Sequence, residues 1–254
     1  RLTSQLPRLD AWKINYAKHF YNIYINSKHI DGAEKIVLTC DNPQAKVEMR
    51  ISNGKTITAW QEYAEPVTFP KGVGAVEARV QIKGSKSDMP ATVKEYETHT
   101  ALGAKVTLVN MPHEKYNAGG KDALVNGFKG PDNDYGGDEW LGFSGKDIIA
   151  TLEMEAGHTI DRVEARFFVS QGQWIYPPRD MKVYIYDALG KEKEVMAKTT
   201  ITENGKIYKV VLNFDKPIET DKLKVEVNRY GLIPAGAQGA GNEAWMFCDE
   251  VFVR

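Results

Sequence analysis

The chain has 254 residues, with 33 basic and 34 acidic side chains and a formal net charge of −1. This balance excludes the broad positive field by which proteins attract nucleic acids or anionic membrane surfaces. No stretch approaches the roughly 18 consecutive apolar residues that a membrane-spanning helix needs, and the 42% hydrophobic content is typical of folded domains.

The first 21 residues have the spacing of a helix. Leu2, Leu6 and Leu9 recur at intervals of four and three, which places them on one helical face. Pro7 predicts that this helix is short or interrupted. Because the chain begins RLTSQLPRLD, without Met or a basic-then-apolar leader, we expect it to be a piece of a longer protein.

Residues 22–104 have the texture of short strands. In AVEARVQIK (75–83) apolar and polar residues alternate without a break, as in a strand with one buried face. Turn-forming stretches such as SNGK and PKGVG separate the segments, and no helical pattern intervenes. This predicts a small antiparallel sandwich. Its five strands are expected at 36–40, 46–52, 66–69, 75–83 and 91–99.

Residues 105–254 predict a second, larger sandwich. A strand in KVTLVN is followed by a glycine-rich, loop-like segment that ends near residue 137. Strand patterns then continue to the last residues, which indicates an antiparallel β-sandwich of the jelly-roll type and an all-β fold. The further strands are expected at 147–154, 162–170, 181–187, 193–201, 206–214, 222–229 and 245–253.

The two cysteines, Cys40 and Cys248, lie far apart in the sequence. Two isolated thiols in apolar strands are the favoured interpretation, and a single disulfide between them stays open. The sequence has no C-x-x-C pair, so neither a structural zinc site nor a redox pair is indicated.

Residues 136–139 read GGDE, four letters that occur at catalytic sites. Glycosidases hold two carboxylates on rigid elements around one bond, whereas this tetrapeptide follows the turn-prone PDNDY. Asp132, Asp134, Asp138 and Glu139 lie among glycines and asparagine, which suits an oxygen-ligand cation site or a solvated loop. We expect no catalytic residue here, and both other interpretations stay open.

A second acidic pair, Asp249-Glu250, lies in the strand WMFCDEVFV (245–253). Strict alternation predicts that Phe247, Asp249 and Val251 share one face, with Glu250 on the other. One carboxylate therefore lies on a mostly apolar face, where it needs a cation, an ion-pair partner or hydrogen-bond donors.

Aromatic residues in expected loops raise the hypothesis of sugar binding, because exposed rings stack on pyranose faces while polar groups bind hydroxyls. Core packing is the alternative for each ring, above all for Trp140 and Trp245. The candidate rings are Trp60, Tyr135, Trp174, Tyr176 and Tyr230, and the candidate polar partners are Gln171, Gln173, Asn228, Arg229, Gln238 and Asn242.

Four segments in the second half follow one family pattern in order: ALVNGFKG (123–130), DEWLGFSGKDIIATLEM (138–154), QWIYPPRDMKVYIYD (173–187) and GNEAWMFCDEVFV (241–253). They resemble the discoidin (coagulation factor 5/8 type C) module, a galactose-binding-like jelly roll, found at the C-terminus of bacterial family 20 β-N-acetylhexosaminidases (chitobiases). The opening RLDAWKINYAKHFYNI is similar to the last helix of their catalytic barrel, and residues 22–104 resemble their small Ig-like module, with MRISNGKTITAW in place of its usual turn.

The resemblance implies domains at 1–21 (a remnant of the catalytic-domain helix), 22–104 (Ig-like) and 105–254 (discoidin-like). In that family the catalytic acids lie in H-x-G-G-D-E, but here Asp134 takes the position of the histidine. The resemblance also implies a structural calcium ion (Ca²⁺), whose ligands map onto Asn126, Asp138 and Glu250.

What the resemblance implies about function is a non-catalytic accessory region of a secreted or periplasmic bacterial glycoside hydrolase. It would contact the enzyme's own catalytic domain and bind glycans that contain N-acetylglucosamine or galactose, through Trp174, Tyr176, Arg229 and Tyr230 in loops of the second sandwich. The alternative is a purely structural role, in which both modules brace the barrel or mediate dimerisation.

Overall fold

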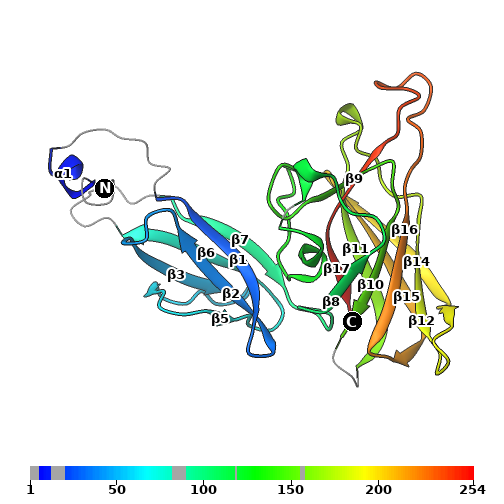
Figure 1. Ribbon diagram of the computed structural model, residues 1–254, viewed down its shortest axis with the longest axis horizontal. Helices are drawn as coiled ribbons and strands as arrows, with labels where there is room; N and C mark the ends of the chain where they lie inside the picture. Colours follow the sequence, from blue (N-terminus) through cyan, green and yellow to red (C-terminus); the bar gives the residue numbers. More distant parts are fainter. Residues whose placement is uncertain (1–5, 13–20, 82–89, 118, 155–157) are drawn as a thin grey trace. The chain divides into compact units, whose positions relative to one another are not determined.

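The computed structural model describes residues 6–12, 21–81, 90–117, 119–154 and 158–254 (Figure 1). The chain divides into two compact units, Arg1–Tyr96 and Glu97–Arg254. Within the described residues no helix is long and apolar enough to cross a membrane. The expected N-terminal helix is present as α1 (Leu6–Ala11), while Leu2 and residues 13–20 lie outside the described part.

The first unit consists of two small antiparallel sheets. One has the order β1-β2-β5 and the other β4-β3-β6-β7. In β6 the residues Val76, Ala78 and Val80 are buried, so the alternation expected from the sequence is confirmed where it is described. The strands are β1 (Ile23–Ile30), β2 (Ala33–Cys40), β3 (Lys46–Ser52), β4 (Gln61–Glu62), β5 (Val67–Thr68), β6 (Val73–Gln81) and β7 (Thr92–Glu97).

The second unit is a sandwich of two five-stranded antiparallel sheets, with the orders β13-β12-β16-β10-β8 and β14-β15-β11-β17-β9. Its core lies between them and is built largely of Val, Ile, Leu and Phe side chains. The strands are β8 (Lys105–Leu108), β9 (Leu141–Ser144), β10 (Ile148–Glu153), β11 (Thr159–Phe168), β12 (Asp180–Tyr186), β13 (Glu192–Glu194), β14 (Ala197–Asn204), β15 (Ile207–Glu219), β16 (Lys222–Asn228) and β17 (Trp245–Val253).

The all-β fold class is confirmed, since the described residues form four antiparallel sheets, and the second unit is a β-sandwich of two five-stranded sheets. The sequence did not predict β1, β4 or β9, and the single strand expected at 193–201 is two strands, β13 and β14, in different sheets. Residues 97–104 are part of the second unit. There Glu97 N–H donates a hydrogen bond to the carbonyl of Gly127, and Thr100 N–H donates one to the carbonyl of Val253. Cys40 is half-buried, Cys248 is buried, and both are free thiols.

Candidate functional site

The connections β8–β9, β9–β10, β11–β12 and β16–β17 meet at one end of the second sandwich. Because the strands are antiparallel, the end of β8 and the start of β10 lie beside the end of β16 and the start of β12. The long connection between β16 and β17, coloured orange to red in Figure 1, extends beyond these strand ends. This arrangement brings Trp174, Tyr176, Arg229 and Tyr230, the residues expected to bind sugar, to the same end of the fold.

Arg229 is held at this end by two carboxylates. Its backbone N–H and Nη1 both donate to Asp147 Oδ1, at 2.9 and 3.2 Å. Its Nε donates to Glu243 Oε2 at 3.3 Å. The hydrogen bond with Asp147 is the main reason that the pKa of Arg229 is raised above its ordinary value. The guanidinium is therefore fixed in position while its side chain remains 36% exposed.

Tyr230 and Tyr176 form a ring pair, with centroids 4.7 Å apart and planes 39° from parallel. Tyr230 is 39% exposed and Tyr176 only 2%. Tyr176 packs with Ile233 and Ala244, and its N–H donates to the carbonyl of Trp245. This corrects the expectation that both tyrosines face a ligand: Tyr176 is the buried support, and Tyr230 is the ring available at the surface.

The indole of Trp174 packs against the backbone of the connection between β16 and β17. It takes a left-handed backbone conformation with φ of 64°, unusual for a residue other than glycine, at the end of the 3₁₀ helix η4 (Gln171–Gln173). A Cβ atom added to Gly239 would lie 2.3 Å from the indole, so the backbone of the β16–β17 connection passes directly against this ring. Trp174 is half-buried and anchors the connection that carries Tyr230.

The other candidate rings have different surroundings. Trp60, in the first unit, lies against the guanidinium groups of Arg50 and Arg79, at 4.6 and 4.2 Å from the ring centroid. Tyr135 packs against Phe168 and Phe247 on the aromatic side of the second unit's core. Neither ring lies in the group formed by Arg229 and Tyr230.

A β-bulge in β17 determines the direction in which the side chains of Asp249 and Glu250 point. Ala165 of β11 faces Val251, but Phe167 faces Cys248, so β17 has one more residue than β11 between these points. Strict alternation is therefore wrong here, because Val251 joins Met246 and Cys248 in the core between the sheets. The bulge turns Asp249 and Glu250 toward the loop that precedes β9 instead of leaving one of them in the core.

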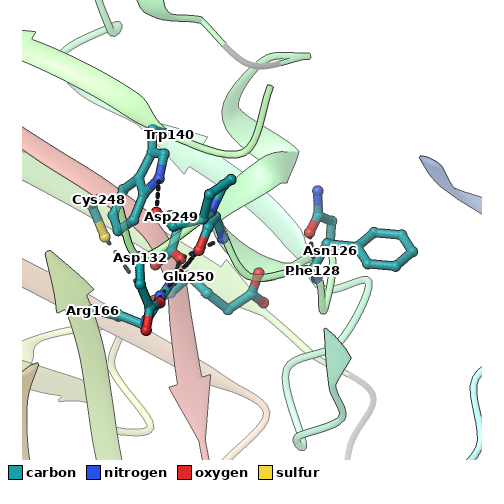
Figure 2. Close-up of polar contacts among 10 residues, drawn as sticks. Asn126, Phe128, Asp132, Trp140, Arg166, Cys248, Asp249 and Glu250 are labelled. Atoms are coloured by element: carbon teal, nitrogen blue, oxygen red, sulfur yellow. Dashed lines mark hydrogen bonds and ion pairs between the residues drawn. The ribbon is translucent and has the colours of Figure 1, made fainter. Parts of the chain in front are cut away.

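Asp249 is fully buried and pairs with Arg166 (Figure 2). It also accepts a hydrogen bond from Gly130 N–H at 2.8 Å. Arg166 also binds the carbonyl of Gly130 and the carboxylate of Asp132, and lies over the Trp140 ring. Burial raises the pKa of Asp249 to about 6, against the lowering effect of Arg166. The cluster ties residues 130–132 of the glycine-rich loop to two central strands.

Glu250 is also fully buried, and its Oε1 accepts from Gly127 N–H at 3.1 Å. The same oxygen lies 2.8 Å from Nε2 of His99. Burial lowers the pKa of His99 to about 3 and raises that of Glu250 well above its ordinary value. Both shifts favour the uncharged forms of the pair, as expected for two groups removed from water together.

The structure connects two of the three residues expected to bind calcium. Asn126 adjoins Glu250 through Gly127, and its Oδ1 accepts from Phe128 N–H at 2.8 Å. Asp138 is exposed, and within the described residues no hydrogen bond or ion pair joins it to either of the other two. Glu250 Oε2 and Asp249 Oδ1 are buried oxygens with no hydrogen-bond partner in the described part of the chain.

The GGDE letters belong to this same loop. Within the loop, Asp134 Oδ1 accepts a hydrogen bond from Gly136 N–H at 2.8 Å. Asp138 is exposed, whereas Glu139 is 7% exposed. The two acids of the tetrapeptide therefore occupy different environments.

Sequence reasoning missed Arg166, His99, Asp147 and Glu243 as members of these clusters. Each finds its partner only through the folded topology. Asp147, for example, lies 82 residues from Arg229 in the chain.

No protein-family model and no curated protein matches the chain. Among solved structures it is similar to the C-terminal domain of a chitobiase from Bacteroides fragilis, with 13% identity, 60% of this chain and 94% of that chain covered, and a TM-score of 0.30. It is also similar to a fucolectin from striped bass (Morone saxatilis) serum, with 14% identity, coverage of 92% and 77%, and a TM-score of 0.37.

A third similar structure is a two-domain protein of unknown function from Bacteroides fragilis, with 10% identity, 96% of each chain covered and a TM-score of 0.34. At these identities and scores the fold is assigned from the strand order and register of the chain itself.

Proposed function

We propose that the second unit is a carbohydrate-binding module whose site lies at the end formed by Arg229 and Tyr230. The observation that carries the proposal is the pairing of an exposed, supported tyrosine ring with a fixed guanidinium on adjacent residues. A ring of this kind stacks on the C–H face of a pyranose, and the adjacent polar groups bind its hydroxyls. The fixed positions of both side chains lower the entropy lost on binding.

The finer proposal is that the chain is the accessory region of a bacterial β-N-acetylhexosaminidase-type glycoside hydrolase, outside the cytoplasm and in contact with that enzyme's catalytic domain. The order of the four family-like segments supports it. The separate environments of Asp138 and Glu139 support a non-catalytic role for the GGDE letters, because acid catalysis at a glycosidic bond needs two carboxylates presented to one site.

Isothermal titration calorimetry with N-acetylglucosamine, galactose and their oligomers tests the binding function. We expect heat of binding at millimolar sugar, which is typical of a shallow site, and its absence would contradict the proposal. Turnover of a chromogenic N-acetylglucosaminide that vanishes in Glu139→Gln would overturn the non-catalytic role.

We also propose calcium as a structural ion beside Asn126 and Glu250. The unpartnered Glu250 Oε2 supports this, since calcium prefers carboxylate and carbonyl oxygens. Asp138, an exposed residue of the same loop, is the third proposed ligand. We expect millimolar CaCl₂ to raise the melting temperature of the wild-type protein. MgCl₂ should not raise it, and CaCl₂ should not raise that of Glu250→Gln. Equal melting temperatures in CaCl₂ and EDTA would contradict the proposal.

A further inference from the structure

The charged groups around Arg229 bear on which sugars the proposed site can accept. Three acidic and three basic side chains lie in the connections and strand ends that adjoin Arg229. They are Lys146, Asp147, Arg179, Asp180, Arg229 and Glu243.

Both guanidinium groups at this end are already paired. Arg229 contacts Asp147 and Glu243 at 3.2 and 3.3 Å. Arg179 contacts Asp180 at 3.3 Å, and that carboxylate also accepts a hydrogen bond from the side chain of Asn228. Lys146 remains as an exposed cation on the residue before Asp147.

We infer that the site selects uncharged sugars and discriminates against uronic acids and other anionic sugars. This inference rests on the proposed carbohydrate-binding function. A sugar carboxylate that approached Arg229 would be a third anion around one guanidinium, beside Asp147 and Glu243, and like charges in contact weaken binding. Neutral hydroxyls meet no such repulsion: they donate to the free lone pairs of the two carboxylates and accept from the guanidinium.

Within this arrangement Glu243 is the specificity-determining residue. It is exposed, and it contacts Arg229 only through the side chain, so its charge can be removed with little effect on the fold. Asp147 differs, because it also accepts from the backbone N–H of Arg229. Glu243→Gln keeps the size and hydrogen-bonding capacity of the side chain while removing one negative charge.

Calorimetric titration of matched neutral and acidic pairs, galactose with galacturonate and glucose with glucuronate, tests the inference at low salt. In the wild-type protein we expect the acid of each pair to bind about fivefold more weakly than the neutral sugar, and Glu243→Gln to reduce this ratio to near one. Lys146→Ala removes a cation instead of an anion, so it should not lower the ratio.

The outcomes separate the two proposals. Binding of galacturonate as tightly as galactose, or an unchanged ratio in Glu243→Gln, would overturn the inference and leave the binding function standing. A ratio that falls in Lys146→Ala would also overturn it. An absence of heat with every sugar and variant would overturn the binding function, and the selectivity with it.

Discussion

The guanidinium of Arg166 pairs with the carboxylate of Asp249 inside the second unit, 83 residues apart in the chain and both almost completely removed from water. This pair explains why an acid lies in the middle of the last strand. Asp249 forms an ion pair with Arg166 of β11 and accepts a hydrogen bond from Gly130 N–H. These two contacts hold the glycine-rich loop against the sheet. The acidic pair near the end of the chain thus has a structural role in this loop.

Removing the Arg166 guanidinium should destabilise the second unit. Arg166→Met leaves Asp249 buried without its partner, and we expect the free energy of unfolding in urea to fall by about 3–5 kcal/mol. Arg162→Met is the matched control on the same strand, since its side chain is 39% exposed against 6% for Arg166. The control should lose less than about 1 kcal/mol. Equal losses would contradict a buried ion pair.

The His99–Glu250 pair predicts a dependence of stability on pH. The folded pKa of His99, about 3, lies below the ordinary 6.5, so the unfolded chain binds the proton more tightly. Stability from this group is complete above pH 6.5 and is lost as pH falls toward 3, by about 1.4 kcal/mol per pH unit.

Two carboxylates with raised pKa values act in the opposite direction, Asp249 between its ordinary pKa of 3.8 and about 6, and Glu250 above its ordinary pKa, so the wild-type curve alone does not isolate His99. The stability difference between wild type and His99→Gln, measured in EDTA and in a Glu250→Gln background, removes both contributions. That difference should shrink as pH falls from 6.5, and a constant difference would show that His99 does not titrate as the burial implies.

The contact between Gly239 and Trp174 predicts a local effect in the β16–β17 connection. In Gly239→Ala the new Cβ would collide with the indole, so the connection must move, and sugar affinity should fall at least tenfold while most of the global stability is kept. Gly236→Ala is the control, because it has the same backbone strain, with φ of 86° against 84°, but no atom within 4 Å of the new Cβ. Equal sugar affinities in the two variants would contradict the anchoring role of Trp174.

The exposed ring of Tyr230 predicts a binding defect without a folding defect. Tyr230→Ala should lower sugar affinity by about tenfold, since a stacked aromatic ring contributes on the order of 1–2 kcal/mol. Tyr24→Ala removes a tyrosine of similar exposure, 41% against 39%, from the first unit and should leave affinity unchanged. Calorimetry on both variants checks this, and a loss in both or in neither would argue against a site at Tyr230.

Period-two alternation and turn residues were enough to predict most strands of both units. They failed for β1, IYINSKHI, whose second half is polar, and for β9, whose four residues lie close to glycine-rich turns. They also failed at Asp249, because the bulge depends on how β17 pairs with β11 and leaves no local signal. The four residues expected to bind sugar lie at one end of the second unit, and their role there stays a prediction. The burial of Tyr176 and the pairing of Arg229 follow from long-range packing.

Chemical-shift mapping of backbone amides during titration with galactose and N-acetylglucosamine tests whether a glycan binds at Arg229 and Tyr230. We expect the perturbed amides to cluster at Asp147 and in residues 228–244, with those of β14 and of the first unit unchanged. Perturbations confined to other surfaces, or no perturbation at tens of millimolar of either sugar, would contradict a glycan site at Arg229 and Tyr230.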